Sequence, residues 1–286
     1  PGHSLRLGEA DGTVGERLKT YVAARAAGGA AMVCMESAPV HPNSHNYEHQ
    51  LVVYDDRVIS GLAATADAVH RRDALLSIIL WHGGHNVSHL DGQAAVAPSP
   101  VPSPSTGETP SVLTAKGIRE IIQAHVDAAV RCWQAGLDAV ELQTATDYLY
   151  GAFLSPRLNW REDAYGGSDQ NRVRIVAETL EAIRDATKGE IAVGLRTSAT
   201  HAIPTDPDDY GLADSVAAMK MLADKGLTDW VSIINGSHWS FPELIAPMAR
   251  PRAEHADLAR DFTTALNIPV VVSGRIRTPA EAEHIL

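Results

Sequence analysis

The sequence predicts an α/β fold built on a parallel sheet, and two observations lead to this. Six apolar runs of strand length begin at residues 30, 75, 139, 191, 230 and 268. Segments with the apolar spacing of amphipathic helices lie between them. Strands and helices that alternate in this way form a parallel sheet with helices packed against it.

The first half of the chain supplies three of these strands. Its expected helices cover residues 15–27, 56–70 and 114–135, and its expected strands cover residues 30–35, 75–80 and 139–142. The first helix stops at a Gly-Gly pair, a normal helix end. The second strand leads into Trp81 and two histidines around Gly83 and Gly84. The region 86–112 is rich in Pro, Ser and Ala and has no periodicity, so we expect a loop there.

The second half repeats the alternation. Its expected helices begin at Asn171, cover 214–225 and 253–266, and begin again near Thr278, and its expected strands are 191–195, 230–234 and 268–273. Polar residues follow each strand directly. Because the carboxyl ends of parallel strands meet at one edge of a sheet, we expect these residues to gather at a single site.

Composition excludes several kinds of partner. The formal net charge is -11, without a run of Lys or Arg, which argues against nucleic acid and an anionic membrane surface. No apolar stretch is long enough to span a bilayer and no signal peptide is visible. Cys34 and Cys132 lie in apolar patterns, as buried free thiols do, so we expect a reducing, cytoplasmic setting. His82 and His85 lack a third ligand at suitable spacing, and we expect no metal site.

The stretch 137–178 carries the most specific motif. The apolar run 139–142 leads to a polar tip and then to Tyr148 and Tyr150, and a long loop follows. The residues that stand at fixed offsets are Phe153, Leu154, Ser155, Pro156, Asn159, Arg161, Asp163, Tyr165, Gly166, Gly167, Ser168, Asn171, Arg172 and Glu178.

In order and spacing these residues resemble the signature of the Old Yellow Enzyme family of flavin oxidoreductases. The resemblance is greatest to the branch that contains trimethylamine dehydrogenase and N-methyl amino acid demethylases, and it extends over nearly the whole chain. It implies an eight-stranded (β/α)8 TIM barrel with FMN at the C-terminal mouth. Since six strands are expected, the chain should be a single FMN-binding barrel domain over 1–286 that lacks the first and last strands, with loop 86–112 over the mouth.

The resemblance also implies which residues bind FMN. The matching positions are Gly2, His3, Ser4, Ser37, Ala38, Arg196, Gly274 and Arg275. Ser4 stands where trimethylamine dehydrogenase has a cysteine bonded to the cofactor, so we expect non-covalent FMN. Arg196 would stabilise negative charge on the reduced flavin. Gly274 and Arg275 match the phosphate-binding turn, where backbone N–H groups and a cation meet the phosphate. Apolar Ile79 replaces a glutamine that usually contacts the flavin.

The substrate side departs from the enoate reductases of this family. Gln143 and Thr146 stand where those enzymes carry a pair that binds the substrate carbonyl, while Tyr148 matches their proton donor. We therefore assign these three residues to catalysis. Trp239 matches a tryptophan of an aromatic bowl that holds an alkylammonium by cation–π attraction. The residues expected to bind substrate are Trp81, Trp239, Glu243 and His238.

These features predict an FMN-dependent oxidoreductase that oxidises an N-methylated amine or amino acid by hydride transfer to flavin N5. The missing carbonyl-binding pair favours this reaction. Retained Tyr148 favours the alternative, NAD(P)H-dependent reduction of an activated C=C bond. A non-catalytic barrel subunit is the third possibility. The expected partners are an amine or enone, an electron acceptor or NAD(P)H, and further subunits of an oligomer or complex. The chain has no Cys cluster, so a 4Fe–4S cluster would lie in sequence beyond it.

Overall fold

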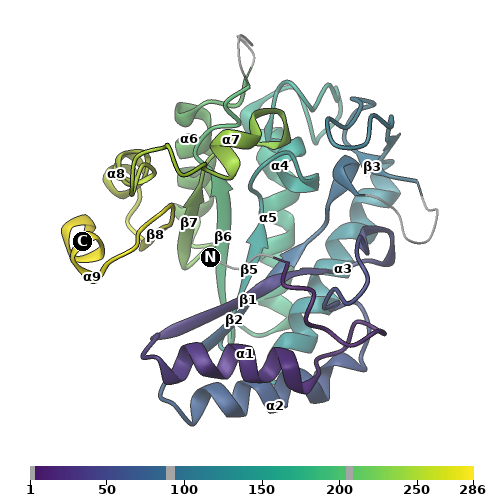
Figure 1. Ribbon diagram of the computed structural model, residues 1–286. Helices are drawn as coiled ribbons and strands as arrows, with labels where there is room; N and C mark the ends of the chain where they lie inside the picture. The colour runs from purple at the N-terminus through teal and green to yellow at the C-terminus, as the bar shows by residue number, and fades with distance from the viewer. Residues whose placement is uncertain (1–3, 88–93, 204–208) are drawn as a thin grey trace.

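The computed structural model describes residues 4–87, 94–203 and 209–286. Six parallel strands form one sheet in the order β1-β2-β5-β6-β7-β8, which confirms the predicted parallel α/β fold. Their bounds are β1 Met32–Pro39, β2 Leu75–Trp81, β5 Ala139–Gln143, β6 Ala192–Ser198, β7 Trp230–Ile234 and β8 Val270–Val272. The sheet curves as an arc of a barrel, with β1 and β8 as its edge strands (Figure 1).

Helices alternate with the strands and pack on the outer side of the arc. The long ones are α1 Glu16–Ala27, α2 Val58–His70, α3 Ala115–Gln134, α5 Asp169–Ala186, α6 Leu212–Ala223 and α8 Ala256–Ala265. Helices α1 and α2 lie side by side below β1 and β2 (Figure 1). Side chains Thr114 and Ser168 cap α3 and α5 by accepting hydrogen bonds from backbone N–H groups. Within the described residues, no helix is both long and apolar enough to cross a membrane.

Several short elements lie at the carboxyl ends of the strands, and the periodicity of the sequence did not predict them. They are η1 Pro42–Ser44, η2 Gly84–Asn86, β3 Val96–Ala97, β4 Ser111–Val112, α4 Leu149–Leu154, η3 His238–Ser240 and α7 Phe241–Leu244, while α9 Pro279–Ile285 ends the chain. Strands β3 and β4 pair in parallel within the predicted loop 86–112, and β3 contacts α4. Part of that loop, residues 88–93, lies outside the described residues.

The two faces of each strand are different in kind. Side chains facing the helices are aliphatic and belong to the main core: Val140, Leu142, Val193, Leu195, Val231 and Ile233. The alternate residues point to the inside of the arc, as the period of a strand requires. Register aligns Gln143 with Arg196 and Arg196 with Ser232, so these polar side chains form one layer near the carboxyl ends.

Gly194 shows how sequence shapes this inner face. It pairs with Trp230, and a Cβ atom on Gly194 would lie 2.0 Å from the Trp230 ring. The glycine therefore leaves the space that the Trp230 indole occupies beside β6. From this position on β7 the indole N–H reaches across β6 and donates to Glu141 on β5.

The motif residues of the long loop are connected by hydrogen bonds and an ion pair. Asn159 donates from its amide to the carbonyls of Phe153 and Tyr165, at 2.7 and 2.8 Å. The Tyr165 hydroxyl donates to Glu178 of α5 at 2.8 Å. Arg161 pairs with Asp163 and donates to the carbonyl of Leu113. The fixed spacing of the motif thus reflects a loop anchored to α5 behind the strand ends.

Candidate active site

Several residues predicted for substrate binding and catalysis converge at the carboxyl ends of the strands. Trp81 ends β2, and Tyr148 immediately precedes α4. The Trp81 and Tyr148 rings meet edge to face, with centroids 5.2 Å apart and an interplanar angle of 89°. On its other side Tyr148 meets the His238 ring at 5.0 Å and 70°. Burial raises the pKa of the Tyr148 hydroxyl, which therefore stays protonated.

Directly before Tyr148 in the chain is Asp147, a residue to which the sequence analysis gave no role. It is fully buried and accepts hydrogen bonds from the Nδ1 atom of His238 at 2.6 Å and from the backbone N–H of the same residue at 2.9 Å. Asn86 donates its amide at 2.8 Å, and His85 Nε2 lies 3.3 Å away. Burial alone would raise the pKa of Asp147, but the hydrogen bonds from His238 and His85 hold it well below its usual range. The one feature of the sequence that could have pointed to Asp147 is its position directly before the predicted catalytic residue Tyr148.

A second buried carboxylate, Glu141, lies deeper inside the arc. It accepts from Arg196 Nε at 2.5 Å, from the Ser232 hydroxyl at 2.6 Å and from the Trp230 indole at 3.2 Å. Burial opposes the charge of Arg196, yet the carboxylate of Glu141 raises the arginine pKa. Glu141 was also missed, although a charge within an apolar run is a signal. Arg196, the predicted flavin contact, is therefore fixed in direction and fully charged.

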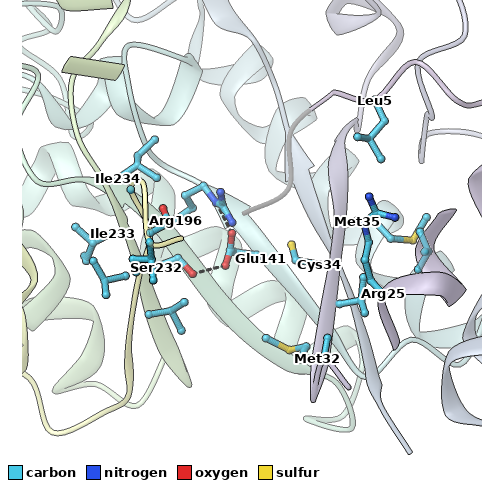
Figure 2. A pocket seen from close by; sticks show the side chains of 18 of the residues that line it. Leu5, Arg25, Met32, Cys34, Met35, Glu141, Arg196, Ser232, Ile233 and Ile234 are labelled. Carbon is cyan, nitrogen blue, oxygen red and sulfur yellow. Dashed lines mark hydrogen bonds and ion pairs between the residues drawn. The ribbon is translucent and has the colours of Figure 1, made fainter. Parts of the chain in front are cut away.

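A cavity lies inside the arc, between the two edge strands. Its volume is about 530 Å³. Figure 2 shows Arg196 and Ser232 bonded to Glu141 on one side of it and Cys34 of β1 on the other. Leu5, Gly274 and Arg275 also line it.

The expected phosphate turn has a glycine in a conformation that other residues rarely adopt. Gly274 has φ +125°, and a Cβ atom there would lie 2.7 Å from the His255 ring. The Arg275 side chain donates to the backbone carbonyls of Pro247, at 3.2 Å, and of Arg250. The cation is thus engaged by the segment before α8, and phosphate binding by Gly274 and Arg275 stays a prediction.

Three other predicted residues have their own partners. Glu243 forms an ion pair with Arg250. The Trp239 ring has the Arg157 guanidinium 5.0 Å from its centroid. Thr146 has φ 58°, and its N–H donates to the Ser198 hydroxyl at 2.8 Å, so this residue shapes the turn that leads to Tyr148.

The N-terminal part of the predicted flavin site is only partly described. Gly2 and His3 lie outside the described residues, whereas Ser4 is described and half-buried. Ser37 and Ala38 belong to β1 and pair with Ile79 and Leu80 of β2. Next to them, Glu36 accepts a hydrogen bond from the backbone N–H of Leu5 at 2.9 Å, and burial raises the pKa of Glu36 to about 7.

Buried polar atoms at the strand ends fit a polar ligand. Among the described residues, the amide oxygen of Gln143 and the indole nitrogens of Trp81 and Trp239 are buried without a hydrogen-bond partner. Such atoms are costly to bury unpaired, so a ligand with polar edges would complete them. Gln143 lies beside Arg196 in the sheet register, which brings an amide and a cation to the same place. These residues fit the polar edge of a flavin ring.

A parallel α/β arc with its polar residues at the carboxyl ends of the strands is the architecture of cofactor-dependent barrel enzymes. The model of the NADH:flavin oxidoreductase / NADH oxidase family, an FMN family, matches residues 4–286. The chain belongs to this family of FMN-dependent oxidoreductases, as its motif predicted.

Curated relatives are diverse in activity. The chain is 35% identical to an NADH oxidase of Thermoanaerobacter brockii over 289 residues, which cover 100% of the chain and 44% of that protein. It is 34% identical to an NADPH dehydrogenase of Geobacillus thermodenitrificans, covering 96% of the chain and 77% of the relative. It is 32% identical to a probable N-methylproline demethylase of Rhizobium meliloti, over 96% of the chain and 41% of that protein. The chain thus spans less than half the length of the first and third of these relatives.

Solved structures share the fold. A 2-naphthoyl-CoA reductase in complex with 2-naphthoyl-CoA matches with a TM-score of 0.91 and 25% identity, over 99% of this chain and 45% of that one. A histamine dehydrogenase from Rhizobium sp. 4-9 matches with a TM-score of 0.84 and 25% identity, over 95% of this chain and 40% of that one. The fold of this chain is therefore similar both to that of a 2-naphthoyl-CoA reductase and to that of a histamine dehydrogenase.

Proposed function

We propose that the protein oxidises an N-methylated amine or amino acid with FMN as its hydride acceptor. The observation that carries the proposal is an ionised, buried carboxylate, Asp147, which is bonded to the His238 ring, and that ring contacts the edge-to-face pair of Tyr148 and Trp81. An alkylammonium is attracted by aromatic faces and by a nearby negative charge, and both attractions are stronger away from water.

The carboxylate in this proposal differs from the one expected from sequence. Glu243 is paired with Arg250, so its charge is already balanced. The Arg157 guanidinium lies over the Trp239 ring, and its positive charge would repel a substrate ammonium placed there. Trp81 and Asp147 therefore take over the roles first given to Trp239 and Glu243. Trp239 and His238 would bound the same substrate space.

Bound FMN would supply the chemistry of accepting a hydride from the carbon next to the amine nitrogen. Gln143 and Arg196 would bind its polar edge, and Gly274 with Arg275 would meet its phosphate. Ser4 offers no thiol, so the cofactor would be held without a covalent bond. An electron acceptor, a cytoplasmic location and assembly into an oligomer or complex belong to the same proposal. The 32% identity to a probable N-methylproline demethylase and the fold shared with a histamine dehydrogenase support it.

The test is stopped-flow reduction of the bound flavin by dimethylglycine, N-methylproline and trimethylamine. Trp81→Leu keeps an apolar wall and removes most of the ring quadrupole, so amine affinity should fall roughly 5- to 30-fold, equivalent to about 1–2 kcal/mol. Trp160→Leu is the matched control, because Trp160 is 60% exposed and lies on the long loop. Equal loss in both variants would remove Trp81 from the amine site.

Reduction of an activated C=C bond is the second candidate, and Tyr148 favours it. Its buried hydroxyl stays protonated, as a proton donor must. The 34% identity to an NADPH dehydrogenase and the fold shared with a 2-naphthoyl-CoA reductase support this reading. Tyr148→Phe separates the two reactions. Reduction of the flavin by amine should survive the change, whereas enone turnover should fall by about 10²–10⁴. Rapid reoxidation by cyclohexenone that needs the Tyr148 hydroxyl, with no bleaching by any amine, would make the protein a reductase.

A further inference from the structure

Asp147 joins three loops that come from distant parts of the chain. Its own loop follows β5, His85 and Asn86 follow β2, and His238 follows β7. Figure 1 shows these strand ends meeting at the same edge of the arc. Burying a carboxylate costs free energy unless hydrogen bonds compensate the lost hydration. Here several hydrogen-bond donors surround the single carboxylate of Asp147.

The two bonds to His238 fix both the place and the tautomer of its ring. One oxygen of Asp147 receives the backbone N–H of His238 and the Nδ1 atom of its imidazole. An ionised carboxylate can only accept, so the proton of the neutral ring is on Nδ1. The Nε2 atom then carries the lone pair. The ring edge meets Tyr148, which lies against Trp81, so His238 belongs to the same group of side chains as the proposed substrate site.

We propose that Asp147 is a positioning residue that holds His238 so that its Nε2 atom takes a proton from the bound substrate nitrogen. This inference rests on the proposed amine oxidation. It gives the buried aspartate a purpose that neither the resemblance nor the fold supplies.

The chemistry requires such a group. An alkylammonium has no lone pair on nitrogen, so its methyl carbon cannot release a hydride. In the proposed step the N–H bond breaks, its proton bonds to His238 Nε2, and its electron pair stays on the amine nitrogen. The lone pair can then form the C=N bond as the carbon gives up a hydride, which bound FMN would accept, and water adds to the iminium. Asp147 stabilises the imidazolium that forms, as a carboxylate does beside a catalytic histidine.

Charged groups near His238 could also contribute to the pH dependence of the rate, so its neighbours have to be identified. Among the described residues, Asp147 and Tyr148 contact the His238 ring. His85 bonds to the same aspartate, and His201 is near enough for the charges of Asp147, His85 and His238 to affect its pKa. Burial lowers the pKa of His201 to about 4, so this neighbour is uncharged near neutral pH. Tyr148 is also uncharged there. Asp147 is the fixed negative charge in direct contact with the His238 ring.

The first experiment is the pH dependence of flavin reduction by N-methylproline in the FMN-loaded protein. In the unaltered protein the limiting rate should rise with pH as His238 loses its proton, and then level off. Asp147→Asn keeps an oxygen that accepts from Nδ1 but removes the charge. The rise should therefore move to lower pH, and the plateau should fall at least about tenfold. His238→Gln should abolish the rise.

Ser103→Ala is the control for merely structural damage. Ser103 is buried and donates to Asn86, so the variant disturbs the same network one residue away from Asp147. Its pH profile should match that of the unaltered protein. If Asp147→Asn changes the rate without moving the rise, Asp147 does not act through His238 and the inference is overturned.

The second experiment reads His238 directly, without catalysis. Nitrogen-15 NMR of histidine-labelled protein, with His238 assigned from the His238→Gln variant, reports tautomer and titration midpoint. The unaltered protein should show the Nδ1–H tautomer, and Asp147→Asn, which removes the neighbouring charge, should lower the midpoint. An Nε2–H tautomer, or equal midpoints, would overturn the inference. If no amine reduces the flavin, the proposed function fails, and the NMR result still decides whether Asp147 positions His238.

Discussion

Arg196→Met measures what the ion pair inside the arc contributes to stability. Glu141 is 3% exposed and Arg196 is 5% exposed, so neither charge is well solvated. In the variant Glu141 keeps only the neutral donors Ser232 and Trp230. Breaking a buried pair from one side typically costs about 3–5 kcal/mol, because it leaves an uncompensated charge. We expect a loss of that size in the free energy of unfolding at pH 7.

The double variant Glu141→Gln/Arg196→Met separates charge from packing. The glutamine keeps an amide oxygen that accepts from Ser232 and Trp230, but it carries no charge. Replacing both partners of a buried pair is often nearly neutral. The double variant should therefore recover most of the stability that the single variant loses.

The assay is urea unfolding of the flavin-free protein, followed by circular dichroism. With a slope of about 3 kcal/mol per molar urea, the single variant should unfold at a urea concentration roughly 1–1.7 M lower. The reasoning fails if the single and double variants lose the same stability, since that result would assign the effect to lost packing.

Two further predictions concern the cofactor and pH. Arg196→Ala should weaken FMN binding and lower the flavin reduction potential, because it removes a cation beside the reduced anion; an unchanged potential in a redox titration would exclude Arg196 from the flavin site. Glu36 has its pKa raised from 4.5 to about 7 by burial, so its stabilising contribution is present below about pH 4.5 and is lost as pH rises through 7. Glu36→Gln should therefore match the unaltered protein at pH 4.5 and exceed it at pH 8 by on the order of 2–3 kcal/mol in urea unfolding. A difference that stays constant over this range would contradict the assignment.

The sheet and the motif could be predicted from sequence because their causes are local. Alternating apolar runs and helical spacing follow from burial of one face. The long-loop residues stand at fixed offsets because they bond to one another, as Asn159 does to Tyr165 and Tyr165 to Glu178. The number of strands in the sheet follows from the same patterns, and the barrel resemblance follows from the motif.

The site was harder to predict because its contacts join distant positions. Asp147 and His238 are 91 residues apart, and Glu141 and Arg196 are 55 residues apart. Each pair depends on two loops or strands being brought together by the sheet. Neither the capture of Glu243 by Arg250 nor the contact of Arg275 with the Arg250 carbonyl could be foreseen, because the segment between α7 and α8 has no periodicity.

The strand order has a consequence for how the chain is made. In the six-stranded sheet each strand pairs with the strand that precedes it in that sheet along the sequence. During synthesis, which proceeds from the N-terminus, each new strand can therefore pair with the edge of the sheet already formed. None of the six strands has to be inserted between two earlier ones. The loop that carries Asp147 is synthesised after the loop that carries His85, and His238 comes later still. The contact between Asp147 and His238 thus awaits β7, the fifth of the six strands in order of synthesis.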